Sequence, residues 1–144
     1  MDRTVYLSLG ANLGDREGTI DRALELLQER IGPLRRRSDW YYSAPVGFES
    51  EHEFCNICAA FVSTLEPLEL LHVTQAVERE LGRTEKSIRH ADGTTEYRDR
   101  TIDIDIIEYE GVAMQTEELT LPHPRYKERE FVIVPLGQIK NPAL

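Results

Sequence analysis

The chain has 144 residues, and its 26 acidic and 17 basic side chains give a formal net charge of −9. This length suits one domain with a substantial core, and no apolar run approaches the roughly 20 residues of a membrane-spanning helix. The N-terminus lacks the apolar region of a secretory signal, and two cysteines cannot make a disulfide framework. An acidic chain is also a poor nucleic-acid binder, since such proteins present a basic face. We therefore predict one cytoplasmic domain over residues 1–144, with no membrane or nucleic-acid partner.

The first half of the chain predicts a strand, a helix and two further strands. Residues 4–9 are β-rich and stop at a glycine. Asp15 is a plausible N-cap for a helix whose apolar residues recur at helical spacing until the glycine and proline at 32–33. Aromatic residues in 35–43 favour a second strand, and the apolar stretch 54–64 predicts a third.

The second half predicts a helix, a long loop and a final strand. Pro67 opens a helix with one apolar stripe, which Gly82 ends. Residues 83–100 are polar without periodicity, and loops of that length are usually functional or mobile. A strand over 101–109 follows, and a short helix over 128–139 is interrupted by Pro135.

This order of elements is β-α-β-β-α-β, which predicts an α+β fold of the ferredoxin-like class. In that fold two helices cover one face of a four-stranded antiparallel sheet. The segment after the last strand is expected to form only a small C-terminal appendix. The fold by itself indicates no function, because it hosts many unrelated activities.

The most informative residues are two aspartates in the last predicted strand. Alternating side chains on a strand point to opposite faces, so Ile102, Ile104 and Ile106 can pack inward while Asp103 and Asp105 share the other face. Their Cα atoms are then about 7 Å apart. Two such carboxylates can grip one hard cation or share a pair. A solvated charged face is the alternative, although aspartate is disfavoured in strands.

Basic residues are frequent in the loop before these aspartates. Cationic side chains beside a carboxylate pair suit phosphoryl transfer, in which they neutralise charge on the transferred group. The loop carries nearly as many acidic residues, however, so its composition alone favours a solvated excursion. The basic residues are Arg83, Lys86, Arg89, Arg98 and Arg100.

Other polar residues fit a small-molecule site but have simpler explanations. Gln75 and Glu78 share one helix face and could bind a nucleotide or merely face solvent. Phe54 and Asn56 share a strand face and could hold a flat heterocycle, or pack in the core. Cys55 and Cys58 are three apart on a strand, so we expect their sulfurs on opposite faces, unable to chelate one metal.

Taken together, the sequence resembles the 6-hydroxymethyl-7,8-dihydropterin pyrophosphokinase family almost from end to end. Each matching segment is weak alone, but all of them occur in order. They are LGANLGD at 9–15, SAPVG at 43–47, FCN at 54–56, Q-x-x-E at 75–78 with GR at 82–83, RTIDID at 100–105, and LPHPR at 121–125.

The resemblance implies an enzyme that transfers diphosphate from ATP to the pterin hydroxymethyl group and releases AMP. Asp103 and Asp105 would hold two Mg²⁺ ions along the triphosphate, and Arg83 and Arg100 would stabilise phosphate charge. The resemblance places around the nucleotide Gln75, Glu78, Ile106, Thr120, His123 and Arg129. It places around the pterin Ser43, Ala44, Pro45, Val46, Phe54, Asn56 and Phe131.

Two other functions remain open from the residues alone. One is a non-catalytic module that senses a small metabolite, which would have no need for paired aspartates beside arginines. The other is a different metal-dependent nucleotidyl or phosphoryl transferase on the same sheet. Product analysis separates the latter, because AMP marks diphosphate transfer and ADP marks ordinary kinase chemistry.

Overall fold

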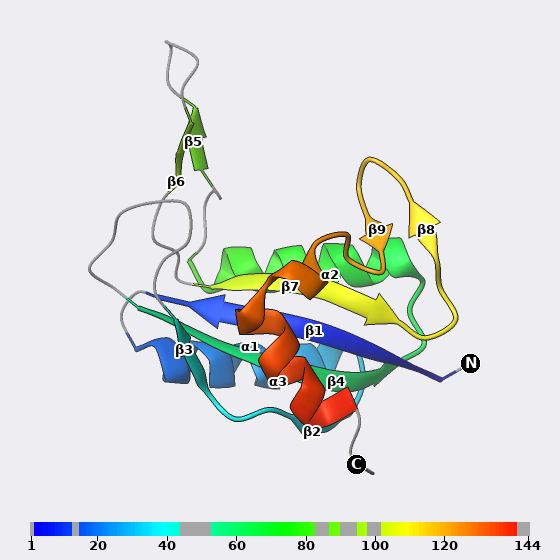
Figure 1. Ribbon diagram of the computed structural model, residues 1–144. Coiled ribbons are helices and arrows are strands. Elements are labelled where there is room, and N and C mark those ends of the chain that lie inside the picture. Colours follow the sequence, from blue (N-terminus) through cyan, green and yellow to red (C-terminus); the bar gives the residue numbers. More distant parts are fainter. Residues whose placement is uncertain are drawn as a thin grey trace.

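The computed structural model describes residues 2–12, 15–43, 53–82 and 102–140, together with the backbone of 87–89 and 95–97. One antiparallel sheet runs through the centre in the order β2-β4-β1-β7, and β3 pairs with the other half of β4 (Figure 1). Its strands are β1 (Arg3–Ala11), β2 (Leu34–Arg37), β3 (Tyr41–Ser43), β4 (Phe54–Ser63) and β7 (Asp103–Tyr109).

Three α-helices and two small hairpins complete the described structure. The helices are α1 (Arg16–Arg30), α2 (Pro67–Glu80) and α3 (Glu130–Lys140), and the 3-10 turn η1 (Tyr126–Glu128) precedes α3. The hairpins pair β5 (Ser87–Arg89) with β6 (Thr95–Tyr97), and β8 (Met114–Gln115) with β9 (Thr120–Leu121). The predicted α+β class with an antiparallel sheet and helices packed on it is therefore confirmed.

The predicted strand over 35–43 is two strands. Ser38 interrupts the ladder because its hydroxyl accepts a hydrogen bond from the Cys58 N–H at 3.0 Å. Its own N–H donates to the Cys58 carbonyl at 2.9 Å, so the chain stays attached to β4 through the break. The sheet consequently has five strands rather than the predicted four.

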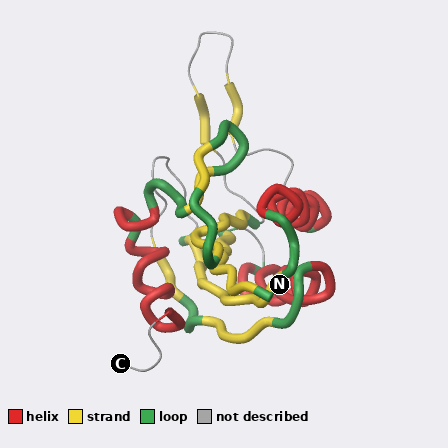
Figure 2. The backbone as a smooth tube through the Cα atoms, turned by 90° about the vertical axis from the view of Figure 1, so that its right-hand side faces the viewer, coloured by secondary structure: helices red, strands yellow, loops and turns green. Residues whose placement is uncertain are grey.

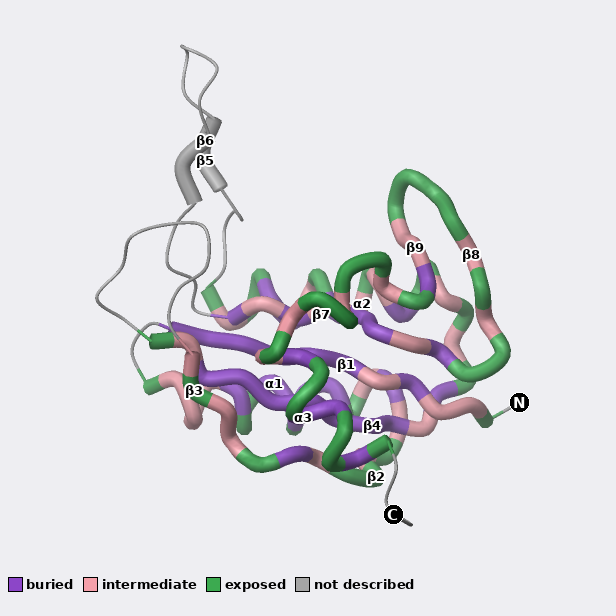
Figure 3. The backbone as a smooth tube through the Cα atoms, viewed as in Figure 1, coloured by how far each residue is buried: buried purple, intermediate pink, exposed green. Residues whose placement is uncertain are grey.

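The main core lies between the sheet and the helices α1 and α2. Alternate residues of β1, β4 and β7 are directed into it, among them Leu7, Ile57 and Ile104. Asp15 caps α1 as predicted, because its carboxylate accepts from the Gly18 N–H at 3.0 Å. Figure 3 shows this buried centre of the sheet between exposed outer surfaces.

The helix predicted over 128–139 is present as α3, in the segment that was expected to form a small C-terminal appendix. Helix α3 covers the opposite face of the sheet from α1 and α2 (Figure 2), and a second core lies between α3 and the sheet. The small side chains Cys58 and Ala60 let the helix approach β4 closely, and Val132, Leu136 and Ile139 are buried against them. Pro135 lies inside α3 and is itself buried, so it does not end the helix.

An irregularity in β7 determines what each part of that strand presents. Leu7 pairs with Ile106, but the preceding Tyr6 pairs with Glu108, so Ile107 has no partner position on β1. Such a β-bulge interrupts the two-residue alternation. Before it, Ile104 and Ile106 enter the main core; after it, Ile107 enters the second core and Tyr109 the main one.

Both cysteines are expected to be inert in the folded protein. They lie fully buried on opposite faces of β4, as predicted, Cys55 in the main core and Cys58 in the second. Burial disfavours the thiolate and raises the pKa of Cys55 to about 11 and that of Cys58 to about 12. Both thiols are therefore protonated at pH 8.

A colorimetric disulfide reagent should label neither cysteine in the native protein and both in guanidinium chloride. Rapid labelling of the native protein would contradict this burial.

Candidate functional site

Asp103 and Asp105 lie on the sheet face opposite the main core. They alternate with the buried Ile102, Ile104 and Ile106, and both are partly exposed. Across the ladder, Asp105 pairs with Ser8 and Asp103 pairs with Gly10. The structure thus brings the two carboxylates to one face, as the alternation predicts.

Beside Asp103, the sheet has a floor made of backbone. Gly10 pairs with Asp103 on one side and with Asn56 on the other. A Cβ atom on Gly10 would lie 2.3 Å from the Asn56 Nδ2 atom, which is too close for any side chain without displacement of the amide. The absence of a side chain at position 10 therefore lets the Asn56 amide lie against the strand.

The Asn56 amide has an unmet acceptor. Asn56 is 5% exposed, and among the described residues its Oδ1 is the one buried side-chain oxygen or nitrogen with no hydrogen-bond partner. A buried polar atom left unsatisfied costs roughly 1–3 kcal/mol. Phe54 lies two residues earlier on β4, on the same face and half-buried. An acceptor beside an aromatic ring suits a flat heterocycle with N–H groups.

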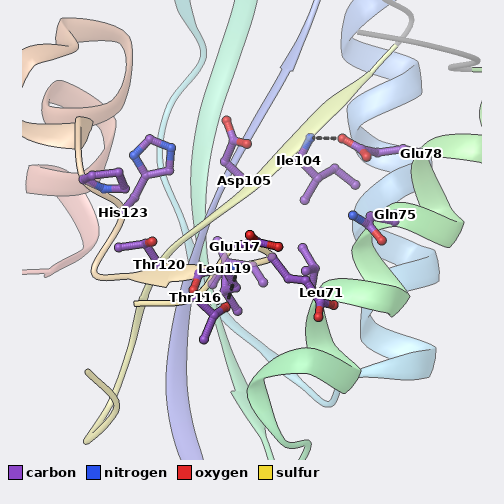
Figure 4. A pocket seen from close by; sticks show the side chains of 13 residues that line it. Leu71, Gln75, Glu78, Ile104, Asp105, Thr116, Glu117, Leu119, Thr120 and His123 are labelled. Atoms are coloured by element: carbon purple, nitrogen blue, oxygen red, sulfur yellow. Dashed lines mark hydrogen bonds between the residues drawn. The ribbon is translucent and has the colours of Figure 1, made fainter. Parts of the chain in front are cut away.

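A second feature is a cleft of about 300 Å³ between α2, β7 and the β8–β9 hairpin (Figure 4). Five of the residues predicted to surround a nucleotide line it, namely Gln75, Glu78, Ile106, Thr120 and His123. Asp105 also lines the cleft, so the cleft opens onto the face that carries the carboxylates. Its remaining lining residues were not predicted, and they are Leu71, Ile104, Thr116, Glu117, Glu118, Leu119 and Pro124.

Glu78 attaches α2 to the edge of the sheet. The strand β7 ends the sheet order, so alternate N–H groups on its outer side have no neighbouring strand. The Glu78 carboxylate, which is 7% exposed, accepts a hydrogen bond from the Ile104 N–H at 2.7 Å. Glu78 therefore fixes the cleft wall in addition to lining the cleft.

His123 is held in place by two backbone contacts. Its N–H donates to the Ile107 carbonyl at 2.8 Å, and its Nδ1 accepts from the Arg125 N–H at 3.2 Å. In the neutral ring, this second bond assigns the proton to Nε2. Figure 4 shows the imidazole beside Thr120 on the side of the cleft nearest Asp105.

The other predicted site residues lie near the start of α3, at the end of β3, or outside the described residues. The Arg129 guanidinium lies 5.8 Å from the centre of the Phe131 ring, at the start of α3. Ser43 pairs with Phe54 at the end of β3. Five of the predicted residues lie outside the described residues, and these are Ala44, Pro45, Val46, Arg83 and Arg100.

The described residues contain neither a cluster of metal ligands nor a helix that could cross a membrane. No group of three or more histidine, cysteine or acidic side chains among them could hold a metal ion. A cation on Asp103 and Asp105 would therefore need further oxygens, from outside any such cluster, to complete its coordination. No helix in the described ranges is long and apolar enough to cross a membrane.

Paired carboxylates beside a cleft of this kind are typical of enzymes that transfer phosphoryl groups. The sequence model of the 7,8-dihydro-6-hydroxymethylpterin-pyrophosphokinase family matches residues 6–141. A 2-amino-4-hydroxy-6-hydroxymethyldihydropteridine pyrophosphokinase of Porphyromonas gingivalis is 50% identical over 136 residues, which cover 94% of this chain and 89% of the relative. The enzyme of the same name from Bacillus subtilis is 38% identical over 140 residues, or 96% of this chain and 79% of the relative.

A solved structure described as HPPK-DHPS in complex with substrates has a similar fold. Its TM-score is 0.68 at 14% sequence identity, and the match covers 96% of this chain and 40% of that one. The chain belongs to the 7,8-dihydro-6-hydroxymethylpterin-pyrophosphokinase family. It is accordingly a pyrophosphokinase of folate biosynthesis.

Removing the Glu78 carboxylate should destabilise the protein by leaving an edge N–H unsatisfied. Glu78→Ala is expected to lower the free energy of unfolding by about 2 kcal/mol, because hydrogen bonds to charged groups are worth about 1.5–3 kcal/mol. Glu78→Gln keeps an acceptor and should lose less. Gln75→Ala on the same helix is the control, since Gln75 is exposed. Urea unfolding measures all three, and equal stability of Glu78→Ala and Gln75→Ala would contradict the structural role.

Proposed function

We propose that this enzyme binds ATP in the cleft and 6-hydroxymethyl-7,8-dihydropterin against Phe54 and Asn56, and transfers diphosphate between them across Asp103 and Asp105. The observation that supports this most is the position of Asp105. It lines the cleft, and through the row Asp103, Gly10 and Asn56 its strand face continues to the buried amide. One continuous face therefore joins a nucleotide-sized cleft to an acceptor for a heterocycle.

Mg²⁺ is the metal that we assign to the carboxylate pair. The donor set fits a hard cation, because it consists of two carboxylates on one face and allows phosphate and water oxygens to complete the shell. When bound, two Mg²⁺ ions would neutralise the triphosphate and align it. Asp103 and Asp105 would hold them, and Arg83 and Arg100, which the family resemblance places at the phosphates, would add positive charge there.

The nucleotide base fits the inner part of the cleft. Leu71 and Leu119 supply apolar surface, and Thr120 supplies a hydroxyl. The Ile104 N–H faces the outer side of β7, where it reaches Glu78. Ile106 is two residues further along the same strand, so its backbone N–H and carbonyl are directed to the same side and can pair with the edge of a base. Gln75 and His123 would complete the lining around the nucleotide from opposite sides of the cleft.

The pterin would lie on the same sheet face, beyond the carboxylates. Asn56 Oδ1 would accept from an N–H of the pterin ring, which satisfies the buried atom left unpartnered in the free protein. Phe54 and Phe131 would cover the two faces of the ring, with Ser43 to Val46 along its edge. Positioning and charge neutralisation then account for catalysis, since the substrate hydroxyl attacks the β-phosphorus in line.

The topology of the sheet and the extent of the family match agree with this function. The strand order β2-β4-β1-β7, with every pair antiparallel, supports a ferredoxin-like topology extended by α3. The match over residues 6–141 supports a single pyrophosphokinase domain. Two free buried cysteines are in keeping with a reducing, cytoplasmic setting.

Product analysis tests the proposed reaction. The chain is incubated with ATP and Mg²⁺, with and without 6-hydroxymethyl-7,8-dihydropterin, and adenine nucleotides are separated by chromatography. The proposal requires AMP that forms only when the pterin is present. ADP instead of AMP would indicate a phosphate transferase, and binding of both compounds without any product would indicate a sensing module.

Neutralising either aspartate should nearly abolish turnover while the fold remains. Asp103→Asn and Asp105→Asn are each expected to lower kcat about 100-fold or more, which is the usual cost of losing a charge-stabilising group. Each variant keeps the side-chain size on a half-exposed position, so its melting temperature should be close to that of the unaltered enzyme. Asp39→Asn, an exposed carboxylate on the β2–β3 connection, is the matched control. Near-normal kcat in either site variant would refute the metal assignment.

Phe54 should contribute to binding of the pterin and not of ATP. Phe54→Ala removes a stacking surface worth about 1 kcal/mol or more, so KM for the pterin should rise at least about fivefold. KM for ATP should stay within about twofold, since Phe54 does not line the cleft. Phe54→Leu separates loss of the ring from loss of apolar volume. Equal changes in both KM values would displace Phe54 from the pterin site.

A further inference from the structure

The bulge in β7 directs two successive residues toward the second core. Tyr6 faces Glu108 in the ladder, and the unpaired Ile107 precedes it. Ile107 is buried against α3, and the Glu108 carboxylate contacts side chains of η1 and α3. The strand that carries Asp103 and Asp105 thus also carries the attachment point of the C-terminal segment.

Glu108 connects the two ends of this segment. Its carboxylate accepts a hydrogen bond from the Tyr126 hydroxyl at 3.3 Å, at the start of η1. Both of its oxygens also accept from the Lys140 ammonium, at the end of α3. The Glu108 side chain is 18% exposed, so this contact is more shielded than an ordinary surface ion pair.

The residues between these two ends include those assigned to the substrates. Arg129 and Phe131 lie between Tyr126 and Lys140, with the guanidinium against the ring. Additional contacts support the same segment, since the His123 N–H donates to the Ile107 carbonyl and the Tyr41 hydroxyl donates to Glu130 at 3.4 Å. The position of Phe131 over the sheet therefore depends on how this segment is fixed to β7 and β3.

We propose that Glu108 is a positioning residue for the transfer reaction: by holding Tyr126 and Lys140 it fixes Phe131 and Arg129 over the face that carries Asp103 and Asp105. This inference rests on the proposed function. In some proteins a shielded ionic contact serves mainly to select one arrangement, and in this proposal the arrangement selected is that of the pterin-binding ring. Glu108 and the two aspartates share strand β7. The segment that carries Phe131 is therefore attached to the same strand that carries the proposed metal site.

The experiment compares two ion pairs that hold different parts of the fold together. Glu108→Gln and Tyr126→Phe each weaken the attachment of the α3 segment without removing apolar volume. Glu80→Gln is the control, because Glu80 pairs with Arg30 between α1 and α2, away from the cleft and the carboxylate face. Melting temperature, kcat, and KM for each substrate are measured for all variants.

We expect Glu108→Gln to raise KM for the pterin about tenfold and to lower kcat, since small displacements of positioning groups have effects of this size. KM for ATP should also rise, but by a smaller factor, because Arg129 is the one residue of this segment that is assigned to the nucleotide. Tyr126→Phe should act in the same direction but less, and the exchanged pair Glu108→Lys with Lys140→Glu should recover most of the pterin KM. Glu80→Gln should leave both KM values unaltered, whether or not it lowers the melting temperature.

The outcomes separate the two claims. If the unaltered enzyme makes pterin-dependent AMP but Glu108→Gln and Tyr126→Phe change only the melting temperature, Glu108 is structural and this inference is wrong. Equal kinetic changes in Glu80→Gln and Glu108→Gln would also overturn it, because they would reflect general destabilisation. Absence of pterin-dependent AMP from the unaltered enzyme would overturn the proposed function and this inference with it.

Discussion

The alternation of side chains along β7 is the constraint on which the rest of the site depends. Burial of Ile102, Ile104 and Ile106 in the main core leaves Asp103 and Asp105 no choice but the opposite face. A shift of one residue in register would place both carboxylates in the apolar core, at a prohibitive cost in desolvation. Hydrophobic burial of three isoleucines therefore determines where the two carboxylates that we assign to catalysis are held.

The edge position of β7 gives the same strand its other roles. One neighbour is β1, and the outer side faces the cleft, where the Ile104 N–H meets Glu78 and the base of ATP is proposed to pair with Ile106. Beyond the bulge, the strand turns its side chains toward α3. The proposed nucleotide site, the two carboxylates and the α3 segment are thus all attached to one strand. The site therefore assembles once β7 is correctly placed in the sheet.

Sequence reasoning was most successful where local periodicity determines structure. The period of two in residues 102–106 was sufficient to predict the carboxylate face, and the Asp15 cap followed from residue type alone. It failed where distant contacts decide. The break at Ser38 depends on a side-chain bond to Cys58. The helix over 128–139 was predicted, but its continuation across Pro135 and its packing against small residues of β4 were not. The cleft residues of the β8–β9 hairpin come together only through folding, and no local pattern indicates them.

We propose that one face of β7 joins a nucleotide cleft to a pterin site. A crystal structure with Mg²⁺, a non-hydrolysable ATP analogue and 6-hydroxymethyl-7,8-dihydropterin tests it most directly. We expect metal ions between Asp103, Asp105 and the phosphates, the base beside Ile106, and a pterin N–H on Asn56 Oδ1. Metal ions held away from both aspartates, or a pterin that leaves the Asn56 amide without a contact, would contradict it.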